Sequence, residues 1–501
     1  MIGAAHSFSR TVQTAIGRAR YHFLDRHYIL TVRGLLIAAC LGLTVLSVVL
    51  MQKGPLFGLV VVAGAAALAL MLFAYRHMTL ACLSVLVIST VFDVGVGSGT
   101  GTDLKLVLAL LLALVFLWAF RLFVVERSVE SVQGRWVIAP ALLFALAVVI
   151  SLVWSMYYVV PSVRPLMYDK LLPRLMTALV LIISPLTALL FANHLRSAGS
   201  LKFIVFWFIL VGALKLPFEI TETPFMTGII NIGGQFTVFM AALAVGQILF
   251  NRALPRYLYL IVLAIVAGWL FVAVGMRFSW LSGWVPLVGG LAVVVALKFP
   301  RLMVVVGLVA VVILLFNFDA VQERFADESA ESGVTRVTAG QQALRVVGDH
   351  FLFGTGPAGY YFYLTIYIGG LFQLSHNNYL DIIAQTGVLG FAMFIWFWLG
   401  VGWYVMQAYR AVPRGGFYHG LAASLASAYV VTLGSMLLGD WVTPFTYTQT
   451  LGGISYTIWH WMLAGAAIAL YYQARRLASA PVEPAALPAD IPHVRARLLA
   501  E

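Results

Sequence analysis

The sequence predicts an all-α polytopic membrane protein with about 14 transmembrane helices. Hydrophobic residues make up 62% of the 501 residues and charged residues 10%, whereas a soluble domain carries about 25% charge. Apolar runs long enough to span a bilayer as helices recur along the whole length. These runs lack a two-residue alternation, which excludes a membrane β-barrel.

The predicted spans are joined by short polar segments, with one long interruption. They cover residues 34–51, 56–74, 78–93, 104–120, 136–156, 171–192, 201–218, 229–250, 257–275, 279–297, 302–317, 379–408, 418–439 and 451–473. The chain therefore divides into a basic interfacial N-terminus (1–33), spans 1–11 (34–317), a large outer loop (318–378), spans 12–14 (379–473) and a tail (474–501). The Gly-rich stretch 95–101 lacks the Lys-Ser/Thr of a phosphate-binding loop, so we expect a flexible loop.

The positive charges give the chain an orientation. With a cytoplasmic N-terminus, the inside segments hold 21 of the 31 Lys and Arg residues, which leaves 10 outside. Cytoplasmic loops carry such an excess, so we expect both termini in the cytoplasm and the large loop on the outer face. The net charge of +12 then follows from topology and attraction to anionic membrane lipids, and it does not indicate nucleic-acid binding.

Arg277 and Lys215 are two of the cations expected on the outer face. A charge at a membrane face is costly unless it is paired or hydrated, so each of them is expected to bind either a ligand or a neighbouring acidic residue. Arg277 is the only charged residue between Arg256 and Lys298, and it has no acidic partner nearby in the sequence. We therefore expect Arg277 to face a ligand. Lys215 precedes Glu219 by one helical turn, so an ordinary ion pair is expected there.

Further candidate cations flank the large loop. Lys170 and Arg174 lie one turn apart where the sixth span begins, so they would share one helix face. Arg336 opens a predicted helix with no acidic partner one turn away, whereas Arg345 is followed by Asp349 at that spacing. We expect Arg336 to face a ligand and Arg345 to form a local pair.

His376 is a candidate general base. It lies in a Ser-His-Asn-Asn sequence directly before the twelfth span, where Ser375 or Asn377 can cap the helix N-terminus. Capping explains Ser and Asn but not His, and a neutral imidazole can take a proton from a hydroxyl group. Asp381 lies one turn further on, where it could orient His376 or act as an ordinary first-turn acid.

These residues carry a resemblance to a known family. "DHFLFGTGPAGYY" and "SHNNYLDIIAQTGVLGF", preceded by Arg336, are similar to the C-terminal signature of the O-antigen ligase and O-antigen/exopolysaccharide polymerase superfamily. "VGMRFSWLSGW" resembles the family's upstream Ser-Arg segment. "GGQFTVFMAALAVG" resembles its eighth-span region, although the Arg often found just before it is missing and Lys215 is the possible substitute. The resemblance covers about residues 200–400.

The resemblance implies a GT-C-like enzyme of the bacterial inner membrane that works on the periplasmic face without a cofactor. Such enzymes move a glycan from undecaprenyl diphosphate to an acceptor hydroxyl group. The implied roles are His376 as base and Arg277 and Arg336 as holders of the diphosphate. No clustered carboxylate pair with metal-site character stands out near His376 in the sequence, so we expect metal-independent transfer. The implied substrate-binding residues are Lys215, Arg174, Lys170, Asn377, Asn378, Asp381 and Tyr360. The aromatic patch that begins at Tyr360 could stack on sugar rings or form an interfacial belt.

Three functions remain open. The first is a polymerase that joins lipid-linked repeat units, possibly with a chain-length regulator as partner. The second is a ligase that places finished glycan on a lipid A-core acceptor, and the third is a small-anion (bicarbonate-like) transporter. The number of spans and the long tail favour the polymerase. The charges lie at outer span ends rather than at mid-membrane, which disfavours transport. His460, between Trp459 and Trp461, is expected to be a packed side chain rather than a proton relay.

Overall fold

The computed structural model describes residues 71–92, 95–97, 103–126, 132–223, 230, 232–277, 281–316, 334–368, 375–447 and 451–479. The chain divides into two compact units, Met1–His77 and Met78–Glu501. Only residues 71–77 of the first unit are described, and they form the end of a helix. The second unit contains the elements that position the candidate site.

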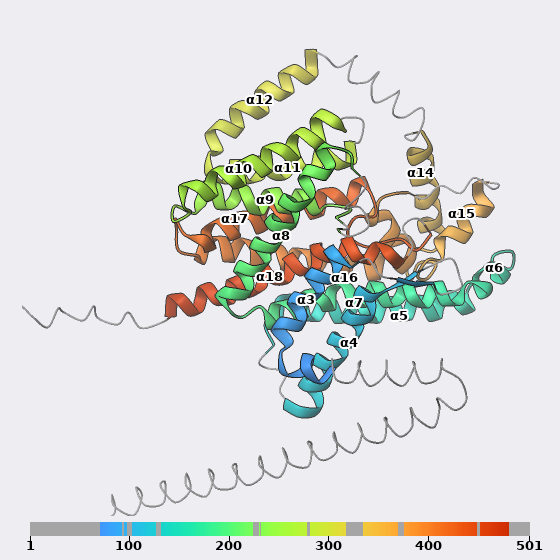
Figure 1. Cartoon of the computed structure of the whole chain (residues 1–501). Helices are drawn as coiled ribbons and strands as arrows, with labels where there is room; N and C mark the ends of the chain where they lie inside the picture. Colours follow the sequence, from blue (N-terminus) through green and yellow to red (C-terminus); the bar gives the residue numbers. More distant parts are fainter. Residues whose placement is uncertain are drawn as a thin grey trace, which may run out of the picture. The chain divides into compact units, whose positions relative to one another are not determined.

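The second unit is almost entirely helical (Figure 1). Its described elements are α3 (Met78–Val91), β1 (Gly95–Gly97), β2 (Asp103–Lys105), α4 (Leu106–Phe120) with the π-helical turn η1 (Arg121–Glu126), α5 (Arg135–Tyr157), α6 (Arg164–Asp169), α7 (Leu171–His194), α8 (Ala198–Ile220), α9 (Phe236–Phe250), α10 (Arg256–Leu270) with the π-helical turn η3 (Phe271–Met276), α11 (Leu281–Lys298), α12 (Pro300–Phe316), α14 (Val334–Asp349), α15 (Tyr360–Ile368), α16 (Asn378–Ala411), α17 (Phe417–Leu438), the 3-10 turn η5 (Leu451–Gly453) and α18 (Ile454–Ser479).

The helices agree with the predicted spans wherever the chain is described. From residue 78 onward each predicted span coincides with a helix within a few residues at most ends, apart from residues 229–250, where α9 begins seven residues late. Eight of the described helices are long and apolar enough to cross a membrane. A polytopic helical membrane protein is therefore confirmed, whereas the count of 14 stays a prediction, and the spans at 34–51 and 56–70 lie outside the described residues.

The Gly-rich segment differs from the prediction of a flexible loop. Residues 95–97 form β1, which pairs antiparallel with β2, so that Gly95 lies opposite Lys105. Glycine has no side chain to disfavour an extended backbone, and this two-stranded pairing satisfies its backbone groups. Residues 98–102, between the two strands, lie outside the described part of the chain.

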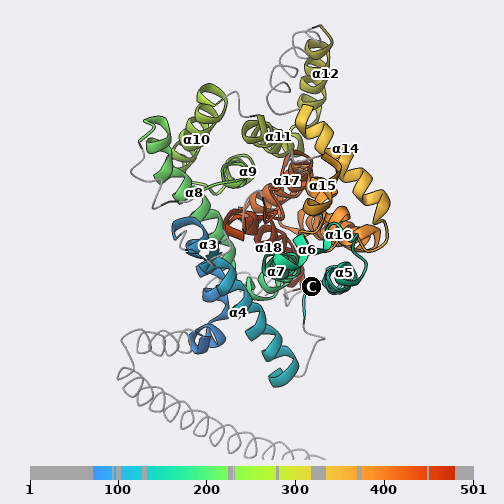
Figure 2. The ribbon, with the colours of Figure 1, turned by 90° about the vertical axis from the view of Figure 1, so that its right-hand side faces the viewer.

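α18 lies in the middle of the helix bundle, as Figure 2 shows along the helix axes. Its membrane-spanning part is almost completely buried among its neighbours. Side-chain hydrogen bonds join the helices around it: Ser424 Oγ donates to Ala242 O at 2.8 Å, Ser427 Oγ to Gly290 O at 2.6 Å, and Trp459 Nε1 to Ser89 Oγ at 3.0 Å. Such bonds connect helices that share an apolar environment.

α16 is broken at Gly387, and this break anchors the loop that leads to the candidate site. Gly387 has φ 68° and ψ −177°, a backbone conformation that favours glycine, and a Cβ there would lie 2.2 Å from Leu352 O. The break frees carbonyl groups of α16, and the turn at Gly354–Pro357 uses them: Thr355 N donates to Ala384 O at 2.9 Å and Gly356 N to Gln385 O at 3.0 Å. The Gly-Pro turn is thereby fixed to the helix.

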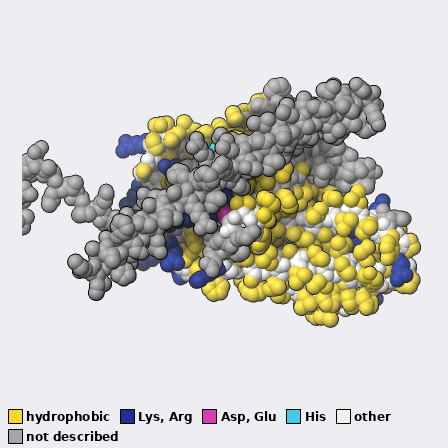
Figure 3. All heavy atoms as spheres, turned by 90° about the horizontal axis from the view of Figure 1, so that it is seen from below, with side chains coloured by type: hydrophobic (Ala, Val, Ile, Leu, Met, Phe, Trp, Pro, Cys, Tyr) yellow, Lys and Arg dark blue, Asp and Glu magenta, His cyan; other side chains and the backbone are white. Residues whose placement is uncertain are grey.

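The start of α16 is covered by a cap of α6, α14, α15 and the segment 439–447. Its core contains Val163, Val346, Tyr363 and Phe445. The outer surface of the bundle is apolar: Figure 3 shows hydrophobic side chains over the middle of one face and Lys and Arg side chains toward its ends. This distribution fits helices that sit in a bilayer with charges at both water interfaces.

Candidate functional site

His376 lies at the start of α16 in an uncommon backbone conformation. The N-cap Asn377 accepts hydrogen bonds from Tyr379 N at 3.0 Å and Leu380 N at 3.2 Å, so capping is confirmed for this residue. His376 has φ 46°, a left-handed value that costs free energy in a non-glycine residue. Its side chain is 42% exposed. The imidazole of His376 therefore lies at the start of α16, at the accessible edge of the cap that α6, α14, α15 and residues 439–447 form.

Asp440 is the carboxylate that faces this imidazole, and sequence reasoning did not single it out. Its Oδ2 lies 3.5 Å from His376 Nδ1, and the Asp440 side chain is completely buried. Asn378 fixes the Asp440 loop, because its Nδ2 donates to Thr443 O at 2.8 Å and its Oδ1 accepts from Val442 N at 2.9 Å. Asn378 thus positions the acid rather than projecting into solvent. The signal in the sequence was an acidic residue at the end of an apolar run.

Asp381 completes a buried carboxyl pair. Its carboxyl group interacts with that of Asp440, and two buried carboxyl groups so close together favour sharing one proton. Asp381 Oδ1 also accepts from Ser375 Oγ at 2.8 Å and from the Tyr360 hydroxyl group. Burial, helped by the charges of Asp381 and Asp440, raises the pKa of Tyr360 well above its usual range, so this phenol remains a donor. One connected network of polar side chains therefore joins His376, Asp440, Asp381, Ser375 and Tyr360.

The aromatic patch is mostly part of the cap core. Tyr360 is fully buried, so its ring cannot stack on a sugar in this structure; it holds Asp381 instead. Phe362 and Tyr363 are also buried. Tyr361 is the member that keeps partial exposure, and its ring stacks on Tyr447 with centroids 4.4 Å apart. An aromatic surface for a sugar would therefore involve Tyr361 rather than Tyr360.

Arg174 is buried against the Gly-Pro turn. Its side chain donates to Ser155 Oγ and, from Nε, to Pro357 O at 3.4 Å. A Cβ on Gly356 would lie 2.7 Å from the Arg174 guanidinium, so only glycine allows the turn to pack this closely. Lys170, one turn earlier, lies in the break between α6 and α7 and is exposed. The two cations expected on one face thus lie in different environments.

Arg277 has an acidic partner that the sequence did not reveal. Its Nη2 contacts Glu219 Oε2 at 2.5 Å, although 58 residues separate them. Lys215 Nζ lies 3.6 Å from the other Glu219 oxygen, which confirms the predicted pair, and it donates to Ile230 O at 3.0 Å. Arg277 thus finds an acidic partner far away in the sequence, because η3 and the end of α8 come together in space. Whether it also faces a ligand stays a prediction.

The Arg277 side chain borders an open pocket with about 540 Å³ of empty space. Glu219, Gly233, Thr237, Trp269 and Trp284 also line it. Lys215 and Arg277 together carry one more positive charge than Glu219 neutralises. The pocket can therefore attract an anion, and its Trp rings offer apolar surface.

Two further candidate cations of the predicted loop, Arg336 and Arg345, lie on α14. Arg336 lies in the first turn of this helix, as expected, but its side chain is outside the described part of the chain. Arg345 and Asp349 are both exposed on α14. His350, which directly follows α14, packs edge-on against Tyr363 with ring centroids 4.4 Å apart, and burial lowers its pKa. Unlike His376, His350 therefore packs against the hydrophobic core of the cap.

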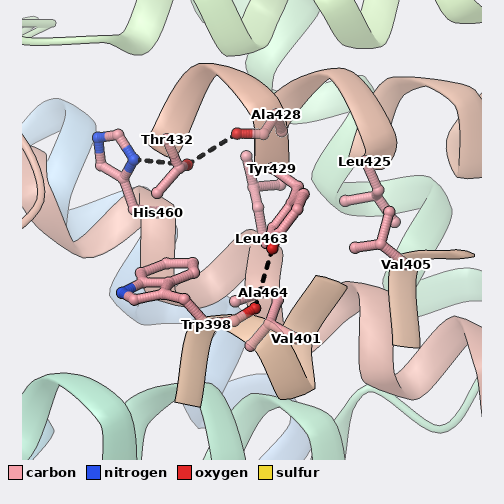
Figure 4. Close-up of a pocket in the computed structure, with 10 residues that line it drawn as sticks. All are labelled: Trp398, Val401, Val405, Leu425, Ala428, Tyr429, Thr432, His460, Leu463 and Ala464. Carbon is pink, nitrogen blue, oxygen red and sulfur yellow. Dashed lines mark hydrogen bonds between the residues drawn. The ribbon is translucent and has the colours of Figure 1, made fainter. Parts of the chain in front are cut away.

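His460 is a packed side chain, as predicted. It lines a small apolar cavity between α16, α17 and α18 (Figure 4). Its Nδ1 lies 2.9 Å from Thr432 Oγ1, and Phe239 packs edge-on against its ring at 4.8 Å. Apolar groups such as Val401 and Leu463 form most of the cavity wall.

The fold and the site define a polytopic membrane protein with an imidazole–carboxyl network at one end of its helix bundle. Residues 260–395 match the family model described as O-antigen ligase, and this segment contains Arg277, Arg336 and His376. The chain therefore carries the domain of the O-antigen ligase/polymerase superfamily, as the resemblance implied. The family match supports glycosyl transfer as the class of reaction, with a lipid-linked glycan and an acceptor as substrates. A search of curated proteins finds no match.

Proposed function

We propose that the protein is a polymerase of the bacterial inner membrane that joins repeat units of an O-antigen or exopolysaccharide on the periplasmic face. The donor in this proposal is an oligosaccharide on undecaprenyl diphosphate, and both termini are cytoplasmic. The His376–Asp440 contact is the observation that carries the proposal, because it places a base beside a buried acid at an accessible helix start. The family match supports the reaction class.

His376 takes the proton of the acceptor hydroxyl group in this mechanism. Its Nδ1 faces Asp440, which leaves Nε2 for the acceptor. Asp381 accepts from Tyr360 and Ser375 through Oδ1, so we assign the shared carboxyl proton to its Oδ2 side. Asp440 then keeps a negative charge, which stabilises the imidazolium that forms. The acceptor oxygen bonds to the anomeric carbon, and the electron pair of the broken C–O bond leaves with the diphosphate.

Cations hold the departing diphosphate. Arg277 and Arg336 are the proposed direct contacts, because an arginine can bind phosphate oxygens through two N–H groups. Lys215 supports Arg277 through their common partner Glu219. Arg174 acts on the turn at Pro357, and exposed Lys170 can attract the anionic donor from solvent. The transfer uses no metal ion and no cofactor in this proposal.

A ligase that transfers finished glycan to lipid A-core is the second candidate, since the matched family is described as O-antigen ligase. The same base and cations would serve it, and only the acceptor would differ. A chain-length regulator would be a partner of the polymerase alone.

Transfer assays on the purified full-length protein distinguish the polymerase from the ligase. We expect it to lengthen a glycan on undecaprenyl diphosphate when that lipid-linked repeat unit is the sole substrate, with and without EDTA. Transfer only when lipid A-core is added would identify the ligase instead. Inactivity with both acceptors, or loss of activity in EDTA, would contradict the proposed reaction.

The orientation has its own test. A cysteine introduced at exposed Ser197, between α7 and α8, should be labelled only from the cytoplasmic side, and one at exposed Lys170 only from the periplasmic side. Labelling of both from one side would refute the proposed topology.

A further inference from the structure

A polar pocket lies at the end of the bundle opposite His376. Its lining includes Thr79, Arg121, Glu126, Asn193, His194 and Arg196, around about 560 Å³ of empty space. α7 connects the two ends: Arg174 lies in its first turn, beside the Gly-Pro turn, and His194 is the last of its 24 residues. At 1.5 Å per residue this helix is about 36 Å long, so the pocket is separated from His376 by about the thickness of a membrane.

The pocket gathers positive charge. Arg121 Nε pairs with Glu126 Oε1 at 2.6 Å, and Glu126 is the only acidic side chain among the described residues that line it. Arg196 lies in the field of Arg121 and also of Arg476, a third arginine from the end of α18. Like charges this close repel one another unless an anion lies between them. The described charges therefore favour an anionic ligand.

Donor groups point to the kind of anion. Arg196 uses Nε to donate to Asn193 O at 2.5 Å, and the described residues accept nothing from its two terminal nitrogens. His194 Nε2 is buried and has no hydrogen-bond partner among the described residues. The backbone of His194 is fixed, because Thr79 Oγ1 donates to His194 O at 2.9 Å. Arginine forks and an imidazole N–H are suited to the oxygens of a phosphate group.

The surroundings favour a lipid as the source of that phosphate. Arg121 opens η1, and three apolar side chains further along this turn, Phe123, Val124 and Val125, are all exposed. An acyl chain can lie on this apolar wall while its headgroup enters the pocket. Basic pockets between transmembrane helices bind anionic headgroups in this way, and π-helical turns such as η1 often occur at functional sites.

We propose that Arg121, Arg196 and His194 bind the phosphate group of an anionic phospholipid at the membrane face opposite His376. This site is independent of the glycosyl-transfer site, and its role is to hold a membrane lipid at the ends of α4 and α7.

Native mass spectrometry of the full-length protein in detergent tests this proposal. Phosphatidylglycerol, phosphatidylcholine and inorganic phosphate are added separately, and the bound fraction is titrated. We expect phosphatidylglycerol to bind the wild type about tenfold more tightly than phosphatidylcholine. Arg121→Gln and Arg196→Gln should each weaken phosphatidylglycerol binding by about tenfold, as for one lost charge-assisted hydrogen bond. Arg301→Gln, an exposed residue of α12 outside the pocket, is the matched control and should bind like wild type.

Glu126→Gln provides a test that misfolding cannot imitate. Removing the acidic competitor of Arg121 should tighten phosphatidylglycerol binding several-fold. Stronger binding of inorganic phosphate than of phosphatidylglycerol would overturn the lipid as the source. Equal binding of both phospholipids, equal loss in Arg301→Gln and Arg121→Gln, or weaker binding in Glu126→Gln would overturn the site itself.

Discussion

Two polar networks at the same end of the helix bundle hold opposite balances of charge. At His376, one buried carboxyl group, that of Asp440, faces the imidazole, and that of Asp381 interacts with Asp440. Around Arg277, two cations share the single carboxylate of Glu219. The first network is suited to stabilise an added proton, and the second is suited to attract an anion. A transferase that deprotonates an acceptor and releases a diphosphate needs both properties.

The two networks also differ in how completely the protein has formed them. Asp381 and Asp440 are almost fully buried and fixed by neighbours, so their positions are set before any substrate arrives. The Arg277 side chain is 48% exposed, and Glu219 already occupies it. Binding a diphosphate there means exchanging one anionic partner for another. The base is therefore preorganised, whereas the anion site is assembled by the substrate.

Loss of the base should have the largest effect. We expect His376→Ala to lower the rate of glycan transfer by about 10²–10⁴-fold while the protein still binds the lipid-linked donor. His77→Ala, at an exposed histidine far along the chain, is the control and should keep wild-type activity. Transfer by purified His376→Ala at a wild-type rate would show that His376 only shapes the helix start.

Loss of one cation should come next. Arg277→Ala and Arg336→Ala should each raise the barrier by about 2–4 kcal/mol, the range for one preorganised donor to developing charge. Arg345→Ala, on the exposed face of α14, should have little effect. Steady-state transfer assays on purified variants measure all three. Equal losses in the three variants would indicate that these substitutions disturb the fold rather than the catalytic step, and the contrast between the networks would disappear.

Substituting Asp440 tests the preorganised network without removing the base, His376. Asp440→Asn should lower the rate by about 10–10²-fold, because the imidazolium loses its negative neighbour. Binding of the donor should stay unchanged, which separates this effect from that of Arg277→Ala. Loss of donor binding in Asp440→Asn along with the rate would show that Asp440 acts only through the fold.

Local spacing explains which parts of these networks the sequence could predict. Helix-length apolar runs located the helices from α3 onward, and the one-turn spacing of Lys215 and Glu219 predicted their ion pair. His376 stood out because capping did not explain it. Asp440 and the Arg277–Glu219 pair depend on contacts between segments 64 and 58 residues apart, by residue number, and no local period records such contacts.

Burial was equally hidden from the sequence. Tyr360 and Tyr361 are adjacent aromatic residues, yet one is fully buried and holds Asp381, whereas the other is partly exposed. Which ring faces inward depends on how α15 packs beneath Phe445 and Tyr447. The break of α16 at Gly387 is likewise stabilised by the Gly354–Pro357 turn rather than by its own neighbours. Tertiary packing decides such features.

The smallest expected effect distinguishes His350 from His376. Burial lowers the pKa of His350, so its neutral form is favoured in the folded protein. As the pH falls below about 6.5, the unfolded chain takes up this proton more readily than the folded chain, and stability should decrease. His350→Gln should remove that part of the acid destabilisation and leave the glycan transfer rate near wild type. Thermal melts of both proteins across this pH range, with transfer assays in parallel, measure the two outcomes. If His350→Gln instead abolished transfer with an unchanged melting profile, the base would be His350, and the network at His376 would serve the fold.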